Sequence, residues 1–591
     1  MARQAGRVED HAVPGSGHGG PPDLAPLRTE RWPGDDKGDA AMSHPWLTDY
    51  PEGVDYGASL ETYPSIVHLI EDACGRYGPQ ICAECLGHSY TFSELDRRAA
   101  DFASFLQGLG LERGDRVAVM LPNIGQFGIA SFGILRGGFT SVNVNPLYTA
   151  RELRHQLNDS GAKAIVILEN FAATLEEVIA ETNVDHVIIA RMGDMLPALK
   201  RTLVNMVVKH LKKMVPGFDL PRAISFRDAL VKGAASPMTP VEVGPDDIAF
   251  IQYTGGTTGV AKGAVLRHSN VVANVAQGIA YNGSGLPPTG ARVIQSLPLY
   301  HIFALGMALI AFQNGYRQLL IPNPRDMKGF IKELKGKPFG MIPGVNTLFN
   351  GLMNTPGFAD LDFSELRCTF GGGTATLKDT SDRWQKVTGK PILEGYGLSE
   401  TSPVLTGNHV STPGFTGTVG HPVPGTIISL RDEHENEVSA GEPGELCAKG
   451  PQVFSGYYNR PDETAKAFTA DGFFKTGDIA VMDEKGRFKI VDRKKDMIIV
   501  SGFNVYPTEI EGVVAEMPEV LECACIGVPS EKTGETPKLF IIRKDPALTE
   551  ASVKEHCKSN LTAYKRPSIV TFVEDLPKSP VGKVLRKELR Q

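Results

Sequence analysis

The sequence has no long uninterrupted run of apolar residues, and this absence argues against a membrane-spanning helix. Such a helix needs about 20 consecutive apolar residues, and no stretch of the 591-residue chain approaches that length. Residues 1–41 also lack the apolar core of a signal peptide and are rich in Gly, Pro, Asp and Arg. Because that composition cannot bury enough surface to order a chain, we expect residues 1–41 to form a disordered tail.

Cysteine is scarce, and so is net positive charge. The eight cysteines are mostly unpaired in spacing, which argues against a disulfide framework and favours a reducing compartment. Cys82-x-x-Cys85 has no second Cys or His pair at ligand spacing, so incidental thiols are favoured over a zinc site. The net charge is −7, whereas nucleic-acid binding normally requires a basic domain. We therefore expect a cytoplasmic protein with no nucleic-acid partner.

Short apolar runs alternate with helix-length segments between about residues 60 and 410. The runs of strand length are 116–121, 163–168, 186–190, 292–297, 317–321, 340–342 and 366–370. Strands that are apolar on both faces and separated by helices are typical of parallel sheets covered by helices. We therefore predict an α/β fold for this part of the chain.

The pattern of residue types changes twice further along the chain. Turn pairs such as Pro424-Gly425 punctuate short strands over residues 417–491, which predicts a small β-rich subdomain. A compact α+β pattern resumes after a short charged link at residues 492–496. At 591 residues the chain is also too long for one core. The predicted units are a large N-terminal domain of parallel-type α/β subdomains (42–491, its β-rich part at about 417–491), a hinge (492–496) and a small mobile α+β domain (497–591).

The segment 253–264 reads Tyr-Thr-Gly-Gly-Thr-Thr-Gly-Val-Ala-Lys-Gly-Ala and follows the apolar run 248–251. Glycines let a backbone fold closely around oxyanions, while exposed amides, hydroxyls and a lysine bind them. The spacing differs from the common P-loop, because two residues separate Gly259 from Lys262. The pattern predicts a polyphosphate cradle, with a flexible surface loop of small residues as the alternative.

Four further motifs follow this segment. Two glycine-rich motifs, 370–373 and 394–401, each end a strand. Thr476-Gly-Asp478 then places a carboxylate after a tight turn, and the segment 578–583 presents Lys583 near the C-terminus. Each motif taken singly suits an ordinary turn or a solvated lysine. Their joint presence in this order is what indicates a nucleotide site.

The five motifs together resemble those of the adenylate-forming enzymes, which include acyl-CoA synthetases, luciferases and the adenylation domains of peptide synthetases. The resemblance extends from about Met42 to Gln591. Within this group the chain most resembles bacterial long-chain fatty acid–CoA ligases, over the segments 144–149, 297–304, 502–507 and 576–583. The resemblance implies an enzyme that uses ATP and Mg²⁺ to activate a fatty acid as acyl-AMP and transfers the acyl group to CoA. AMP and pyrophosphate are the implied by-products.

The resemblance also implies roles for individual residues. Lys583 would bridge the fatty-acid carboxylate and the α-phosphate, Lys262 would bind phosphate, and His301 would lie near the carboxylate. Glu400 is the implied Mg²⁺ ligand, a role that suits a hard carboxylate oxygen. Tyr396 would stack near adenine, and Asp478 would accept from the ribose hydroxyls beside Arg493. The implied ATP-binding residues are Thr254, Gly255, Gly256, Thr257, Thr258, Gly259, Lys262, Gly372, Gly373, Gly395, Tyr396, Gly397, Ser399, Asp478 and Arg493.

The second half-reaction requires Lys583 to leave so that the CoA thiol can reach the carbonyl. The family achieves this by rotating its C-terminal domain, and the matching pivot in this chain is Lys495. The polar run 492–496 would supply the backbone freedom of a hinge. After rotation, Ser501, Gly502 and Phe503 are the implied CoA-binding residues.

Other readings of the substrate and acceptor stay open at this point. The gating Trp that some long-chain synthetases carry after the histidine is replaced here by the segment 302–305, and no Asp is placed to bind an amino-acid ammonium. The alternatives are an aryl-acid–CoA ligase, a fatty acyl-AMP ligase that serves a carrier protein, and a nucleotide-dependent binder without turnover. The sequence does not decide between a monomer and a homodimer.

The segment 199–215 combines basic and apolar residues without an acidic one. Its cations are Lys200, Arg201, Lys209, Lys212 and Lys213, and its apolar residues at near-helical spacing are Leu199, Leu203, Met206, Val207, Leu211 and Met214. A basic amphipathic helix can lie on an anionic membrane. The alternative is a surface helix whose apolar stripe packs on its own domain. The first reading predicts peripheral contact with the inner face of the cell membrane.

Overall fold

The computed structural model describes residues 44–57, 60, 63–254, 261–501, 503–578 and 584–590. The predicted tail 1–41 therefore lies outside the described residues. Residues 45–591 form one unit by their internal contacts.

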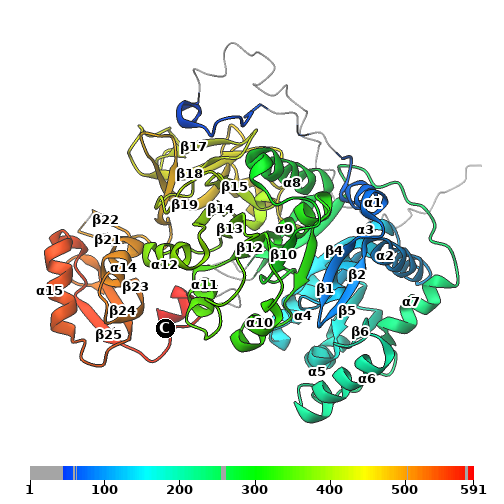
Figure 1. The fold of residues 1–591 in the computed structure, drawn as a ribbon. Helices are drawn as coiled ribbons and strands as arrows, with labels where there is room; N and C mark the ends of the chain where they lie inside the picture. The colour runs from blue at the N-terminus through cyan, green and yellow to red at the C-terminus, as the bar shows by residue number, and fades with distance from the viewer. Residues whose placement is uncertain are drawn as a thin grey trace, which may run out of the picture. The chain divides into compact units, whose positions relative to one another are not determined.

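A mostly parallel seven-stranded sheet is built from the first apolar runs (Figure 1). Its order is β7 (Ile224–Ser225), β6 (His186–Ala190), β5 (Ala164–Leu168), β3 (Arg116–Met120), β4 (Thr140–Asn143), β8 (Ile248–Thr254) and β9 (Lys262–Arg267). Only the last pair, β8 with β9, is antiparallel. This hairpin places Thr254 and Lys262, which lie on either side of residues 255–261, at the edge of the sheet.

A nine-stranded sheet follows, and its central strands are also parallel. Its order is β16 (His421–Pro422), β15 (Val404–Gly407), β14 (Ile392–Gly397), β13 (Cys368–Gly371), β12 (Met341–Gly344), β10 (Arg292–Gln295), β11 (Arg317–Leu320), β1 (Ile81–Cys85) and β2 (His88–Thr91). The strands from β14 to β1 run parallel, and antiparallel pairs close both edges. The predicted α/β fold with parallel sheets is confirmed.

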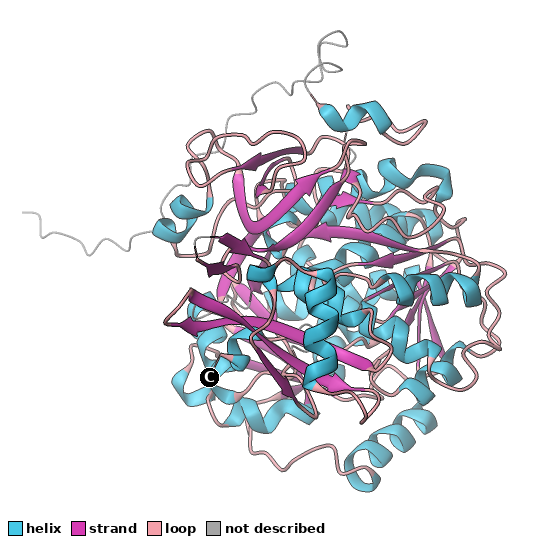
Figure 2. Ribbon diagram, turned by 90° about the vertical axis from the view of Figure 1, so that its left-hand side faces the viewer, coloured by secondary structure: helices cyan, strands magenta, loops and turns pink. Residues whose placement is uncertain are grey.

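Helices accompany both sheets, as Figure 2 shows in cyan beside the magenta strands. They are α1 (Ile66–Tyr77), α2 (Phe92–Gln107), α3 (Gly125–Arg136), α4 (Ala150–Ser160), α5 (Ala172–Glu176), α6 (Ala198–Met206), α7 (Phe226–Ala234), α8 (His268–Asn282), α9 (Ile302–Gln313), α10 (Met327–Leu334), α11 (Asn346–Met353) and α12 (Lys378–Thr388). Local sequence sets their ends. In α4, Thr149 and Glu152 form a reciprocal cap, and Gly161 ends the helix in the left-handed conformation.

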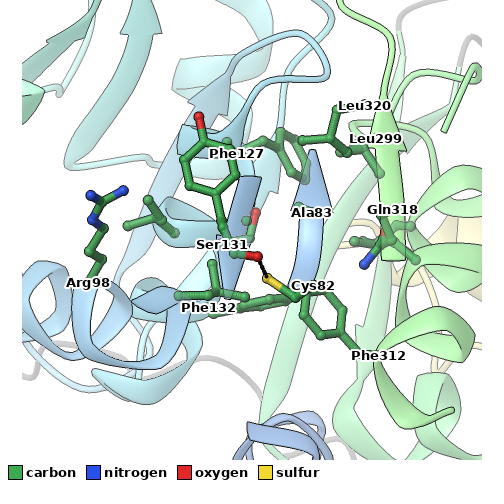
Figure 3. Close-up of a pocket in the computed structure, with 17 residues that line it drawn as sticks. Cys82, Ala83, Arg98, Phe127, Ser131, Phe132, Leu299, Phe312, Gln318 and Leu320 are labelled. Carbon is green, nitrogen blue, oxygen red and sulfur yellow. Dashed lines mark hydrogen bonds between the residues drawn. The ribbon is translucent and has the colours of Figure 1, made fainter. Parts of the chain in front are cut away.

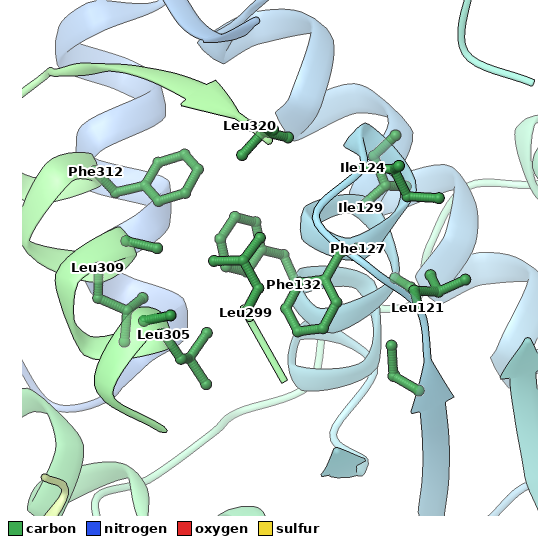
Figure 4. Close-up of a cluster of buried hydrophobic side chains, with 14 of the residues drawn as sticks. Leu121, Ile124, Phe127, Ile129, Phe132, Leu299, Leu305, Leu309, Phe312 and Leu320 are labelled. Carbon is green, nitrogen blue, oxygen red and sulfur yellow. The ribbon is translucent and has the colours of Figure 1, made fainter. Parts of the chain in front are cut away.

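The core between α3 and α9 is apolar and closely packed (Figure 4). Phe127 and Phe132 on α3 face Leu305, Leu309 and Phe312 on α9. Because α9 is apolar on nearly all sides, it is buried rather than amphipathic. This packing holds the start of α9, where His301 lies, in a fixed position.

Two smaller sheets complete the chain. The first is antiparallel and contains β17 (Ile427–Arg431), β18 (Gly444–Lys449), β19 (Phe474–Met482) and β20 (Phe488–Arg493), with α13 (Pro461–Ala467) beside it in sequence. The second contains β22 (Phe503–Val505), β21 (Ile498–Val500), β24 (Gly534–Arg543), β23 (Val520–Ser530) and β25 (Ile569–Phe572). Its helices are α14 (Pro507–Ala515), α15 (Glu550–Asn560) and α16 (Arg586–Leu589), and it has a hydrophobic core of its own. The predicted β-rich and α+β parts of the fold are both present.

Candidate nucleotide and acyl site

The glycine-rich segment is described only at its two ends. Thr254 ends β8 and pairs in register with Lys262, the first residue of β9. The predicted phosphate-binding residues 255–259 lie outside the described residues, as do Gly502 and Lys583. The site can therefore be built from Lys262 and the groups around it.

Lys262 lies between a carboxylate and an aromatic ring. Its ammonium forms an ion pair with Glu463 of α13 and lies 5.2 Å from the centroid of the Tyr457 ring. The backbone holds this arrangement in register, because the amide of Tyr458 donates to the carbonyl of Gly263 at 2.8 Å. A cation over an aromatic face is stabilised by the ring quadrupole.

The hydroxyl of Tyr457 connects this lysine to Glu400. It donates to Glu400 Oε1 at 2.9 Å. Glu400 lies in a short 3₁₀ turn, Ser399–Thr401, and is buried, and this burial raises the pKa of its carboxyl. The sequence analysis did not predict Tyr457 as a site residue, because the segment around it contains several aromatic residues and none of them stands out.

A second group joins Tyr396, Asp478 and Arg493 from three strands. The hydroxyl of Tyr396, on β14, donates to Asp478 Oδ2 at 2.6 Å. Arg493 pairs in register with Asp478 across β19 and β20, and its Nε lies 3.6 Å from Asp478 Oδ1. Burial raises the pKa of Tyr396, and the charge of Asp478 raises it further. The charge of Asp478 also raises the pKa of Glu400, so the two groups are electrostatically coupled.

Two of the predicted glycines, Gly372 and Gly397, lie where another group comes close to a strand end. A Cβ at Gly397 would lie 1.8 Å from the carbonyl oxygen of Pro403, which no side chain can tolerate. At Gly372 a Cβ would lie 3.1 Å from the ring of Phe303. Gly373 follows with a φ of 76°, and Gly395 lies on β14 beside Tyr396. Glycine is therefore needed at Gly397, and a side chain at Gly372 would require Phe303 to move.

His301 is half-buried and forms the N-cap of α9. Its Nδ1 accepts from the amide of Phe303 at 3.4 Å. Since Phe303 also faces Gly372, the first turn of α9 borders the glycine-rich end of β13.

An apolar cavity lies between α3 and α9 (Figure 3). It has a volume of about 40 Å³ and is lined by Phe127, Phe132, Leu299, Leu305 and Phe312 among others. Leu305 and Phe303 are two residues apart on a helix, so they project on roughly opposite sides of α9. The helix therefore separates this cavity from the glycine-rich strand end.

The residues on either side of Lys495 in the charged link 492–496 are bound to different parts of the fold. Lys494 donates its amide to the carbonyl of Gly477 at 2.9 Å and forms an ion pair with Glu445 at 2.8 Å. Asp496 instead pairs with Arg590 at 3.0 Å. Lys495, between these anchors, is exposed.

Asp492 makes contacts on both sides of the link. It lies on β20, yet its Oδ2 accepts from the amide and hydroxyl of Thr508 on α14, at 2.8 and 2.9 Å. Arg586 of α16 donates to Asp492 Oδ1 at 3.3 Å. The residue sequence alone did not indicate these partners.

Ser501 and Phe503 flank the undescribed Gly502. Ser501 has a φ of 51°, a left-handed conformation that L-residues rarely adopt. The exposed ring of Phe503 stacks on Tyr564, with centroids 4.6 Å apart and an interplanar angle of 17°. A pair of accessible aromatic rings offers a flat surface for a planar group.

The segment 199–215 forms α6 followed by a π-helical turn, Val207–Leu211. Its predicted apolar stripe does not pack on the domain. Leu199 is 90% exposed and Leu211 is 77% exposed, while Leu203, Met206 and Met214 are at least half exposed. Only Val208 of these two helices is buried. The predicted alternative of an ordinary packed surface helix is therefore wrong.

Neither a metal cluster nor a membrane-spanning helix is found in the described part of the chain. Over these residues, no group of three or more His, Cys, Asp or Glu side chains is placed to hold a metal ion. No helix among them is both long and apolar enough to cross a bilayer. The eight cysteines are free, and seven of them are buried.

Known proteins resemble this chain over almost its whole length. The family model described as AMP-binding enzyme matches residues 70–458, and the AMP-binding enzyme C-terminal domain matches residues 509–583. A long-chain-fatty-acid–CoA ligase of Escherichia coli O157:H7 is 52% identical over 551 residues, covering 93% of this chain and 98% of that protein. A long-chain-fatty-acid–CoA ligase of Bacillus subtilis is 35% identical, with 92% and 97% covered.

Solved structures agree with these sequence matches. ATP-bound MatB from Rhodopseudomonas palustris is 28% identical with a TM-score of 0.74, covering 89% of this chain and 98% of that one. A fatty acyl CoA synthetase of Mycobacterium tuberculosis is 26% identical with a TM-score of 0.67 and the same coverage. The chain therefore belongs to the AMP-binding enzyme family.

Proposed function

We propose that this chain is an AMP-forming ligase that activates a long-chain fatty acid as acyl-AMP and transfers the acyl group to CoA. The observation that carries the proposal is a pair of neighbouring polar groups, Lys262–Tyr457–Glu400 and Tyr396–Asp478, which residues far apart in the sequence form and which the charge of Asp478 couples. Relatives named long-chain-fatty-acid–CoA ligase cover nearly the same length, which favours this substrate over aryl acids.

Adenylation brings two anions together, so the site must supply positive charge where they meet. Lys262, which pairs in register with Thr254, would bind the phosphates. Lys583 would bridge the fatty-acid carboxylate and the α-phosphate. Tyr396 and Asp478 are paired in a way that suits adenosine, because a carboxylate can accept from two ribose hydroxyls.

The residues present suit Mg²⁺, although the requirement for this ion is part of the proposal. Mg²⁺ is usually bound through one or two carboxylates together with substrate phosphates and water. Glu400 is a single buried carboxylate that is coupled to Lys262 through Tyr457. It would hold the ion, which would neutralise charge on the phosphates.

Transfer to CoA requires a second arrangement of the chain. We assign residues 42–491 to ATP and acyl binding, residues 492–496 to a hinge with its pivot at Lys495, and residues 497–591 to a mobile domain. The anchors on either side of Lys495, at Lys494 and Asp496, support this assignment. Ser501, Gly502 and Phe503 would then contact CoA.

The acyl chain would lie near the first turn of α9. His301 starts that turn and Phe303 faces Gly372, so the turn is adjacent to the nucleotide side of the site. The apolar cavity behind α9 is lined by Leu305 and Phe312, so the side of this helix that faces away from Gly372 is also apolar. An apolar setting of this kind suits a fatty acid.

Peripheral contact with an anionic membrane through residues 199–215 belongs to the same proposal. The exposed apolar residues and the cations of this segment occupy one helical element. A substrate that partitions into lipid would then be met at the inner face of the cell membrane. A carrier protein is the alternative to CoA as the acyl acceptor. A homodimer is the alternative to a monomer as the oligomeric state.

An assay of CoA-thioester formation over a panel of acids tests the proposal. The panel should contain short, medium, long and very long fatty acids together with aryl acids, each with ATP and Mg²⁺. We expect long-chain acyl-CoA with equimolar AMP. Thioester formation only with aryl acids, or acyl-AMP that never reaches CoA, would refute the long-chain ligase.

A further inference from the structure

The ammonium of Lys262 is already paired with a carboxylate of the chain itself. Glu463 approaches it from α13, the segment that follows the backbone pairing between Tyr458 and Gly263. Neither side chain is fully buried, with 29% of Lys262 and 38% of Glu463 exposed. The hydrogen bond from Lys262 holds the pKa of Glu463 below its ordinary value, so this carboxylate is ionised near neutral pH.

Glu463 has a second cation within reach. Lys466, one turn further along α13, lies 3.6 Å from Glu463 Oε1, while Lys262 contacts Oε2. The two oxygens therefore point at two different ammonium groups. If Glu463 turned away from Lys262, it would keep a partner on its own helix.

We propose that Glu463 is an internal counter-ion that occupies Lys262 in the nucleotide-free enzyme and is displaced by the phosphates of ATP. The proposal rests on the function proposed above, because it takes Lys262 as a phosphate ligand. It makes Glu463 a residue that sets the affinity for ATP without touching the reacting atoms.

The physical reason is competition between two anions for one cation. A carboxylate in contact with the ammonium repels an incoming polyphosphate until it moves away. Its partial exposure and the neighbouring Lys466 make that movement inexpensive, so the competition is modest. Because Glu463 has left before chemistry begins, its effect belongs to ATP binding and not to the turnover of the bound complex.

The substitution Glu463→Gln tests this role, with Asp462→Asn as the matched control. Asp462 precedes Glu463 in the first turn of α13 and is exposed. The substitution Asp462→Asn removes the same charge as Glu463→Gln. Calorimetric titration of each full-length protein with MgATP gives the affinity directly, and initial rates give the KM for ATP and kcat. We expect Glu463→Gln to lower the Kd and KM for ATP about three- to tenfold with kcat nearly unchanged. Asp462→Asn should match the parent.

Each other outcome has a definite meaning. A weaker affinity for ATP in Glu463→Gln would mean that the carboxylate positions Lys262 for phosphate, which overturns the counter-ion role. An affinity equal to that of the parent, or an equal gain in both variants, would also overturn it. If the parent itself binds no MgATP, the failure lies with the proposed function and not with Glu463.

Discussion

A single short hydrogen bond joins the phenol of Tyr396 to Asp478, and it illustrates how one residue serves two needs. The ring is half-buried and packs on a hydrophobic cluster, while the hydroxyl donates to a carboxylate that also faces Arg493. Burying a tyrosine hydroxyl is favourable only when it has a partner. The same bond holds Asp478 in one orientation for its proposed work on the ribose.

Replacing Tyr396 by Phe removes this donor and keeps the ring. A hydrogen bond to a charged group contributes about 1.5–3 kcal/mol, so we expect the KM for ATP to rise about tenfold or more. The fold should persist, because the ring volume is retained. Initial-rate kinetics together with a thermal unfolding curve would check both points. An unchanged KM for ATP would remove Asp478 from the proposed nucleotide contact.

Glu394 provides a prediction about pH at the same scale. Burial raises the pKa of its carboxyl from 4.5 to about 7, while its Oε1 accepts from the amide of Thr376 at 2.9 Å. The folded protein therefore holds this proton more tightly than the unfolded chain. Its stabilising effect is complete below about pH 4.5 and is lost as the pH rises through about 7, by roughly 3 kcal/mol.

The variant Glu394→Gln cannot lose this proton. We expect its unfolding temperature to fall less than that of the parent when the pH is raised from 5 to 8. Differential scanning calorimetry of both proteins at the two pH values measures the difference. Parallel pH profiles would show that Glu394 is not the titrating group.

At the scale of elements, α6 and the π-helical turn after it break the usual rule for surface helices. An amphipathic helix normally turns its apolar stripe inward, yet here the stripe is exposed. The segment is nevertheless tied to the domain, since Asn205 accepts from the amide of Gly193 at 2.7 Å and Asn170 donates to the carbonyl of Met214 at 3.0 Å. Its apolar side is therefore displayed on a fixed support.

Reversing the charges of Lys209, Lys212 and Lys213 to Glu tests membrane contact. Each cation near an anionic surface contributes about 1 kcal/mol, so vesicle binding should weaken by more than about a hundredfold. Co-sedimentation with vesicles of anionic and of neutral lipid measures the effect. The same reversal at the exposed Lys328, Lys332 and Lys335 of α10 and its end controls for net charge. Equal loss in both triple variants would refute a specific surface.

At the scale of the whole molecule, the link at residues 492–496 contacts both the four-stranded sheet and the C-terminal α+β part. Lys494 is bound to Glu445 and Gly477 of the four-stranded sheet. Asp496 is bound to Arg590, which follows α16. Asp492 also contacts Thr508 and Arg586 on the C-terminal side, so a rotation at the link must break these contacts. The proposed pivot is Lys495, the exposed residue between Lys494 and Asp496.

Replacing Lys495 by Pro should separate the two half-reactions. Proline fixes φ and restricts the preceding residue, so the rotation should fail while the arrangement for adenylation persists. Single-turnover release of pyrophosphate should stay near the parental rate, whereas acyl-CoA formation should nearly cease. Lys495→Ala, which keeps backbone freedom, serves as the control. An unchanged overall rate in Lys495→Pro would contradict the hinge.

Local sequence patterns were sufficient to predict the strands and the β-rich part of the fold. The apolar runs at 116–121 and 163–168 became β3 and β5, because a strand buried on both faces must be apolar throughout. The turn-rich part after residue 417 became the antiparallel sheet β17–β20. The glycines at 372 and 397 were also recognisable, since crowding at a strand end is a property of single positions.

The sequence by itself therefore determined the α/β class, the order of the elements and the motifs that identify the family. Only the tertiary structure decided which side chains meet. Lys262 and Glu463 are 201 positions apart, and Tyr457 connects that lysine to Glu400 only because β9 and the segment before α13 pair their backbones. The exposure of Leu199 was equally undecided by sequence, because a periodic pattern specifies an apolar face but not what covers it.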